Sequence, residues 1–159
     1  MFFVGAVLYL NGMWLLGKAD SKPVGFFNLL VGVLITVLAV NNHFRATTMA
    51  EHLGAANGLL FGFTYLMVAG HCLLDHSGRA LGWFSLFVAI ATVPNSLMSY
   101  VNGDVRFAII WFMWGFLWFM FFLTQALGNE KVRWVPYLSI FIGLVSAGIP
   151  GYMILWEAW

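Results

Sequence analysis

Apolar residues gather in six long stretches along the chain, and short polar connections separate them. The stretches cover approximately residues 2–17, 24–41, 53–74, 80–100, 107–127 and 134–156. A helix needs a run of about 20 apolar residues to cross a bilayer. No connection is long enough to hold a second domain. The pattern therefore predicts an all-α membrane protein with six transmembrane helices, in a single domain that covers residues 1–159.

The composition agrees with a protein that crosses the membrane several times. Hydrophobic residues make up 62% of the chain and charged residues 8%, whereas soluble domains average about 25% charged residues. The net charge of +1 leaves no basic footprint, so we expect no nucleic-acid partner. Cys72 is the only cysteine, which excludes an intrachain disulfide and a cysteine metal cluster. We expect no bound metal and no cofactor.

The basic residues predict how the chain is oriented in the membrane. Five of the seven lie in or beside the first, third and fifth connections, namely Lys18, Lys22, Arg79, Lys131 and Arg133. Only Arg45 and Arg106 lie on the other side. Because Lys and Arg are enriched in cytoplasmic connections, both termini are expected outside.

The first, third and fifth stretches begin near residues 2, 53 and 107, so a helical hairpin recurs at similar spacing. This spacing favours an internal repeat of three helical hairpins. Pro94 and Pro150 both fall late in even-numbered stretches. Proline removes a helix hydrogen bond to the carbonyl four residues earlier, so we expect kinks at both positions.

Residues 107–127 form an uncharged stretch with three tryptophans on one side of the predicted helix. Trp111, Trp114 and Trp118 are spaced to share one helical face. Phe107, Phe122 and Gln125 fall on that same face. Aromatic residues of membrane helices usually gather at the two interfaces and not along the whole axis. The stripe is therefore either a packing surface between helices or the wall of a pore or pocket for a small neutral molecule.

The third stretch has two distinct faces. Gly54, Gly58 and Gly62 form a ridge of small residues that lets a neighbouring backbone approach closely. The other face carries Asn57, Phe61, Thr64, Tyr65 and Val68. Polar groups at membrane depth need partners or water. These side chains therefore either hydrogen-bond neighbouring helices or line a pore.

Charged residues are missing from the interior of every apolar stretch. Buried ionisable groups carry proton relays and ion pathways, so a pump or an ion channel is disfavoured. The serines of these stretches have no histidine or carboxylate at helical spacing, so no catalytic residues and no enzyme activity are expected. The four histidines, His43, His52, His71 and His76, are expected in or beside solvated loops. Any transported molecule should be small and uncharged.

Three segments resemble the bacterial urea/amide channel family, which includes the acid-gated urea channel and the AmiS-type amide transporters. They are NGLLFGFTYL at residues 57–66, WFSLFVAIATVP at 83–94 and AIIWFMWGFLW at 108–118. Weaker matches at Asn11-Gly12 and Ile149-Pro150 extend the resemblance to nearly the whole chain.

The resemblance implies six helices as three pseudo-repeated hairpins around a pore, in a homohexamer with lipid at its centre. It places the protein in the bacterial inner membrane with both termini outside. It implies passage of urea and short-chain amides such as acetamide and formamide. The family's pore lining corresponds to Leu8, Phe61, Tyr65, Trp111, Trp114, Leu117 and Trp118. Thr64 and Phe107 join this set because they lie on the same predicted faces.

Two departures from the acid-gated member predict little or no acid gating. The outer connections here are short, residues 42–52 and 101–106, and the second has no histidine. Ile142 stands where the resemblance implies a carboxylate in the acid-gated channel. Acid switches need titratable groups. The leading hypothesis is a passive amide and urea channel. The alternatives are a saturable amide carrier, an acid-modulated urea channel that supplies a urease, or a non-transporting partner of an amidase or urease.

Overall fold

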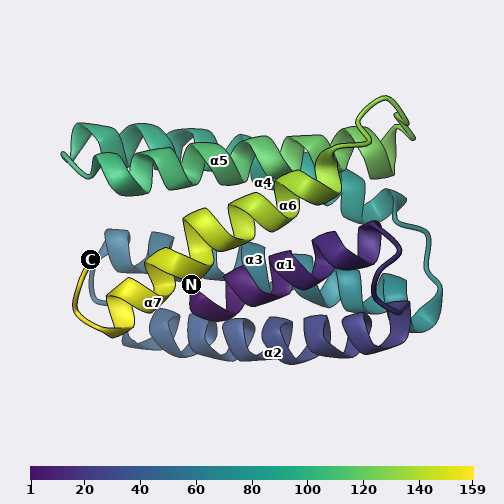
Figure 1. Ribbon diagram of the computed structural model, residues 1–159. Coiled ribbons are helices and arrows are strands. Elements are labelled where there is room, and N and C mark those ends of the chain that lie inside the picture. The colour runs from purple at the N-terminus through teal and green to yellow at the C-terminus, as the bar shows by residue number, and fades with distance from the viewer. The chain divides into compact units, whose positions relative to one another are not determined.

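The computed structural model describes residues 1–159, and all of its regular elements are helices (Figure 1). In chain order they are α1 (Phe2–Leu15), α2 (Ser21–Arg45), α3 (Met49–Leu74), α4 (Arg79–Val101), α5 (Val105–Phe121), the π-helix η1 (Phe122–Ala126), α6 (Val135–Ile142), the π-helix η2 (Gly143–Gly148) and α7 (Ile149–Leu155). η1 continues α5, and α6, η2 and α7 follow one another without a gap. The chain thus has six continuous helical segments, which confirms the all-α prediction.

Five of these segments are long and apolar enough to cross a membrane, by length and composition. The sixth, α1, has 14 residues and is a shorter apolar helix. It ends at Leu15, two residues before the predicted limit, because the chain turns at Gly17, where φ is +71°. Glycine adopts this left-handed conformation without steric cost.

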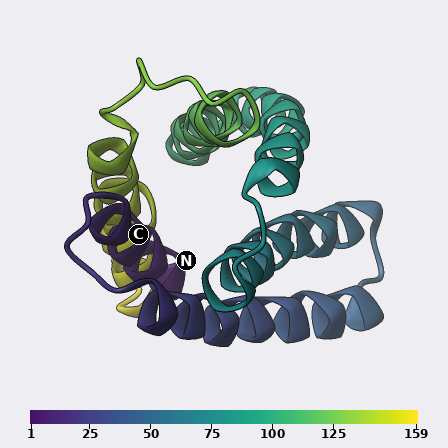
Figure 2. The ribbon, with the colours of Figure 1, turned by 90° about the vertical axis from the view of Figure 1, so that its right-hand side faces the viewer.

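The helices group into two compact units, which are described separately. The α2–α3 unit covers Asp20–Ser77, and the α1/α4–α7 unit covers Met1–Ala19 and Gly78–Trp159. Inside the second unit, α4 and α5 run side by side, and α1 packs along α6, η2 and α7 (Figure 2).

The connection between α2 and α3 is much shorter than the sequence suggested. Residues 42–52 were predicted as a polar loop, but only residues 46–48 lie outside the two helices. A capping box starts α3: the Glu51 backbone N–H donates to Thr48 Oγ1 at 3.3 Å, and the Thr48 N–H donates to Glu51 Oε2 at 3.0 Å. Such a box satisfies two backbone donors at a helix start. The polar residues around it are therefore exposed helix ends.

The glycine ridge of α3 packs against α2, as predicted for two of its three members. A Cβ atom on Gly62 would collide with the side chain of Thr36, and one on Gly58 would lie 3.0 Å from Ala39 Cβ. Gly54 has no atom within 4 Å of that position, so the prediction was wrong there. The close contact is concentrated in the middle of the helix pair.

Close backbone contacts also hold the α1/α4–α7 unit together. A Cβ on Gly5 of α1 would collide with the backbone of Gly148. On α5, a Cβ on Gly115 would collide with the hydroxyl of Thr92 on α4. Without a hydrophobic driving force between helices in lipid, such van der Waals contacts and hydrogen bonds drive helix association.

Pro94 and Pro150, where kinks were predicted, lie in different helical surroundings. Pro94 lies inside α4, which runs without interruption from Arg79 to Val101. Pro150 lies in the first turn of α7, directly after the π-helical segment η2. Because α6, η2 and α7 form one continuous helical segment, Pro150 lies inside it and removes one backbone donor there. The wide turn of η2 precedes the site where the kink was predicted.

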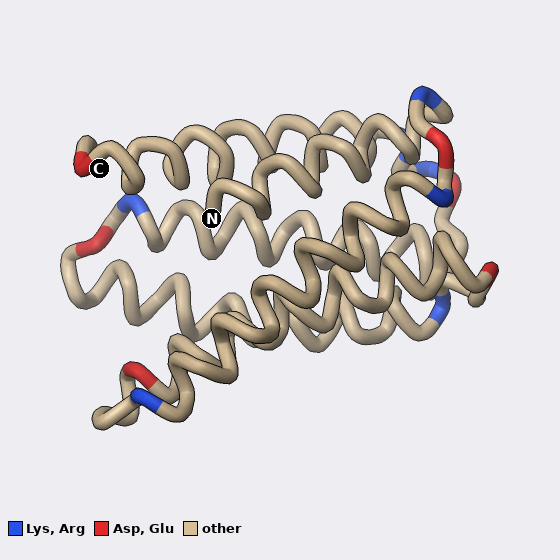
Figure 3. The backbone as a smooth tube through the Cα atoms, turned by 90° about the horizontal axis from the view of Figure 1, so that it is seen from below, with Lys and Arg blue, Asp and Glu red and all other residues tan.

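Charged side chains lie at helix ends and in the connections of both units (Figure 3). Even those inside helices occupy terminal turns, such as Arg45, Glu51 and Arg106. The interiors of the apolar segments are free of Asp, Glu, Lys and Arg, as the sequence indicates.

Candidate functional site

The tryptophan face of α5 points into the protein. Trp114 is 4% exposed and Trp118 is 3% exposed, and Leu117 beside them is also buried. Phe112, on the opposite face, is 69% exposed. Helix α5 therefore presents the phenyl ring of Phe112 outward and the indoles of Trp114 and Trp118 inward.

The indoles of this face contact one another. The rings of Trp111 and Trp114 lie 5.2 Å apart between centroids, with an interplanar angle of 82°. Edge-to-face contacts of this kind are favourable because a positive ring edge meets a negative ring face. The two side chains therefore form a continuous aromatic wall along about one turn of α5.

A hydrogen-bonded relay fixes Trp114 against η2. The indole N–H of Trp114 donates to Ser146 Oγ at 2.9 Å, and the Ser146 hydroxyl donates to the carbonyl of Ile142 at 2.5 Å. All three residues are buried. The indole donor of Trp114 is thus used inside the protein, and this part of the wall is apolar.

Leu8 on α1 meets the same π-helical segment. A Cβ atom added to Gly143 would lie only 2.8 Å from the Leu8 Cβ, so the two backbones are in close contact. The Leu8 carbonyl also accepts a hydrogen bond from Ser139 Oγ at 2.9 Å. Leu8 and Trp114 therefore both contact η2, from α1 and from α5. Ile142, which stands where a carboxylate was expected in the acid-gated relative, is 1% exposed and directly precedes this segment.

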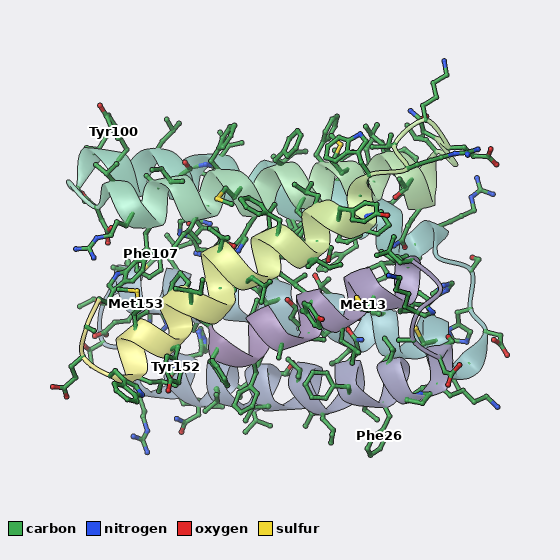
Figure 4. All side chains as sticks on the ribbon, viewed as in Figure 1. Met13, Phe26, Tyr100, Phe107, Tyr152 and Met153 are labelled. Carbon is green, nitrogen blue, oxygen red and sulfur yellow. The ribbon has the colours of Figure 1, made fainter.

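The outermost predicted residue of the α5 face contacts the end of the chain. Phe107 lies near the turn after α7, in the region where Met153 also points (Figure 4). Its ring is 5.7 Å from that of Trp159, and the Arg106 guanidinium lies 5.0 Å above the Trp159 ring. A Schellman motif turns the chain there: the Ala158 N–H donates to the Met153 carbonyl at 2.8 Å.

The predicted residues on α3 belong to the other unit. Phe61, Thr64 and Tyr65 are all buried. The Thr64 hydroxyl donates to the Leu60 carbonyl of its own helix at 2.8 Å, so its oxygen keeps only acceptor capacity. The Tyr65 hydroxyl is buried and has no hydrogen-bond partner. This group can both donate to and accept from a small polar molecule.

The histidines lie at helix ends or in a connection, as expected, and they form two contacting pairs. His43 at the end of α2 and His52 at the start of α3 face each other, with their Nδ1 atoms 3.2 Å apart. His71 Nδ1 contacts the carbonyl of His76. No group of three or more His, Cys, Asp or Glu side chains gathers in the structure.

Two contacts of the site were missed by sequence reasoning. The role of Ser146 as acceptor for an indole 32 residues away has no local signal in the sequence. The contact of Trp159 with Phe107 likewise joins distant positions. The buried serines Ser85, Ser139 and Ser146 donate to backbone carbonyls.

The fold and site define a class: an all-helical, multi-pass membrane protein with an aromatic, uncharged interior face. Residues 1–158 match the model of the AmiS/UreI family of transporters, and the chain belongs to that family. The resemblance noted from the sequence motifs is thereby confirmed.

Relatives of two kinds share its sequence. A putative amidate substrates transporter of Mycolicibacterium smegmatis is 38% identical over 162 residues, covering 100% of this chain and 76% of the relative. The putative transporter AmiS2 of Rhodococcus erythropolis is 38% identical over 158 residues, covering 98% and 77%. The acid-activated urea channel of Helicobacter pylori strain J99 is 34% identical over 190 aligned residues, covering 100% and 97%.

Solved structures share the fold. The crystal structure of the Helicobacter pylori urea channel superimposes with a TM-score of 0.87 at 34% identity, covering 99% of this chain and 96% of that one. A cryo-electron microscopy structure of that channel in a closed state gives a TM-score of 0.86. The alignment of 190 positions with a chain of 159 residues leaves about 31 positions that only the urea channel fills.

Proposed function

We propose that the protein is a passive membrane channel for urea and small neutral amides, including acetamide and formamide, with little or no acid gating. The observation that carries this proposal is the buried, uncharged tryptophan face of α5. Hydrated ions cannot exchange their water shells for indole faces, whereas a flat, neutral amide can pass between them. Weak binding at several positions keeps such conduction fast.

The solute needs hydrogen bonds on its way past these rings. The unpartnered Tyr65 hydroxyl and the acceptor capacity of Thr64 support α3 as their source. The proposed pore-lining residues are Leu8, Phe61, Thr64, Tyr65, Phe107, Trp111, Trp114, Leu117 and Trp118. In this proposal α5 supplies shape and stacking, and α3 supplies polar contacts.

The two units together would form one six-helix channel domain, residues 1–159. We propose a homohexamer in the bacterial inner membrane, in contact with membrane lipid and with both termini outside. The excess of Lys and Arg in the first, third and fifth connections supports this orientation. The protein would not be an enzyme, which agrees with the transporter family it belongs to.

Stopped-flow light scattering on purified protein in lipid vesicles tests the proposal. We expect fast, non-saturating entry of urea or acetamide that is similar at pH 5 and pH 7.5. Flux no faster than in protein-free vesicles would refute a channel. Counterflow of labelled amide would instead identify a saturable carrier. Lack of flux combined with co-purification of an amidase or urease would identify a non-transporting partner.

An acid-modulated urea channel is the second candidate. The pair His43 and His52 favours it, because two imidazoles with Nδ1 atoms 3.2 Å apart repel when both are protonated. The pair lies at the α2–α3 connection, which would lie outside in the proposed orientation. A flux that changes severalfold between pH 5 and pH 7.5 would support this candidate over the first.

A further inference from the structure

A large pocket lies at the end of the α1/α4–α7 unit where η1 leads into the connection to α6. It has a volume of about 820 Å³, and α1, η1, the connection and α6 all contribute to its lining. We call it the η1 pocket. It is too large to fit one small amide by shape, so polar groups must provide any binding.

The η1 pocket lies at the end of the helical segment that carries the aromatic face of α5. Gln125 follows Trp118 by seven residues and lines the pocket together with Thr124. Both residues belong to η1, whose wide turn departs from the α-helix. Single π-helical turns inside α-helices occur frequently at functional sites. The Trp face and this polar pair therefore lie on one helical segment.

Gln125 carries a polar atom that the protein does not satisfy. Its Oε1 is buried and has no hydrogen-bond partner. Buried polar atoms without a hydrogen-bond partner are rare in folded proteins, so this acceptor needs a reason. The Thr124 hydroxyl donates to the carbonyls of Met120 at 3.1 Å and Phe121 at 3.2 Å, which leaves its oxygen as a further acceptor.

These groups match the chemistry of a primary amide. Urea and primary amides offer N–H donors to Gln125 Oε1 and Thr124 Oγ1. A half-turn of the Gln125 carboxamide exchanges its oxygen and nitrogen, and the side chain then donates to a solute carbonyl. A carboxamide therefore pairs with an amide in either orientation, which an ionised carboxylate, an acceptor only, does not.

We propose that Gln125, assisted by Thr124, is a solute-binding site for urea and primary amides at the loop end of the α5 tryptophan face. This inference rests on the proposed channel function and extends it. At this position the solute loses its water on the way to the apolar wall around Trp114 and Trp118. Gln125 replaces part of that hydration, which lowers the cost of entering the wall.

Replacement of Gln125 by methionine tests the site, because methionine keeps the length and unbranched shape but removes the hydrogen bonds. We expect urea permeability per reconstituted protein to fall about 3- to 10-fold, as for one lost hydrogen bond. Urea has two NH2 groups and acetamide has one, so the ratio of urea to acetamide permeability should fall as well. Gln125→Glu keeps acceptor oxygens and should lie between wild type and Gln125→Met.

Asn95→Met is the matched control. Asn95 is a half-buried amide on α4 that lies outside the η1 pocket, and its Nδ2 donates to the Ala91 carbonyl at 3.0 Å. We expect its urea to acetamide ratio to equal that of wild type. An unchanged ratio and permeability in Gln125→Met would overturn the site, as would an equal loss of both solutes. Absence of flux in wild type would instead contradict the channel itself.

Discussion

Helices α3 and α5 carry most of the proposed pore residues, but Tyr65 and Trp114 on these helices use their polar groups in opposite ways. On α5, the Trp114 indole N–H is donated to Ser146, so this residue presents only its apolar ring. On α3, Thr64 bonds its own helix and the Tyr65 hydroxyl has no partner. In the proposed channel a neutral solute needs both kinds of surface, because shape excludes ions and polar contacts replace water.

The two helices also pack differently. The side of α3 that meets α2 uses glycines, with Gly58 and Gly62 allowing close backbone contact. On α5, only Gly115 makes such a contact, against Thr92 of α4. The glycine contacts of α3 fix its position against α2, so its other face is free to carry polar side chains. The following substitutions test this division of roles.

The largest effect is expected from Gly62→Val. The new side chain would collide with Thr36, and overpacking of this kind costs about 1–3 kcal/mol or more. We expect a lower thermal unfolding midpoint in detergent and less folded protein in the membrane. Gly54→Val is the matched control on the same ridge, because nothing lies within 4 Å of that position. Equal loss of stability in both variants would show that close helix contact is not what Gly62 provides.

Trp118→Ala should change selectivity strongly. Removing a 3% exposed indole opens the proposed wall. The permeability of longer amides such as butyramide, relative to that of acetamide, should therefore rise about tenfold, which corresponds to about 1.4 kcal/mol. The measurement is the ratio of the two permeabilities in proteoliposomes. Phe112→Ala removes an aromatic ring from the 69% exposed face of the same helix and should leave the ratio unchanged. If both variants behave alike, the tryptophan face does not line the path.

Tyr65→Phe should reduce flux without harming the fold. It deletes a hydroxyl that makes no protein hydrogen bond, so the unfolding midpoint should stay the same or rise slightly. A solute hydrogen bond worth about 0.5–1.5 kcal/mol corresponds to a loss of about 2- to 10-fold in urea permeability. Tyr100→Phe is the control, since Tyr100 is 66% exposed. A destabilised Tyr65→Phe protein with normal flux would assign the hydroxyl a structural role.

Apolar periodicity was enough to predict the helices and the face of α5, because membrane helices must be apolar and their faces follow from spacing. It failed at residues 42–52, where polarity marked exposed helix ends and not a loop. The capping pattern Thr48-x-x-Glu51 indicates the start of a helix, but the polar residues around it were interpreted as a loop. The contacts of Trp114 with Ser146 and of Phe107 with Trp159 join distant positions, and only the tertiary structure reveals them.

The glycine ridge of α3 also shows what residue spacing cannot predict. Spacing placed Gly54, Gly58 and Gly62 on one ridge, but it could not say where the neighbouring helix comes close. Likewise, the spacing that put Thr64 and Tyr65 on one face could not tell which hydroxyl is satisfied. Periodicity predicts which residues share a face, whereas contact and hydrogen bonding depend on the partner helix.

The smallest effect is expected from acid. His43 and His52 are the titratable pair at the α2–α3 connection, with Arg45 and Glu51 as the neighbouring charges on their own helices. Glu51 is held by the Thr47 and Thr48 N–H groups at 2.7 and 3.0 Å, so it stays at the helix cap and does not pair with an imidazolium.

When both imidazoles are protonated, water and salt screen their repulsion because the site is largely exposed, and rotation of the side chains can relieve it. We therefore expect urea flux at pH 5 and pH 7.5 to agree within about twofold, as for a screened surface interaction. The double variant His43→Asn/His52→Asn should keep that ratio. A wild-type flux that rises severalfold at pH 5, and loses this rise in the double variant, would make the α2–α3 connection an acid sensor and replace the ungated channel with the acid-modulated one.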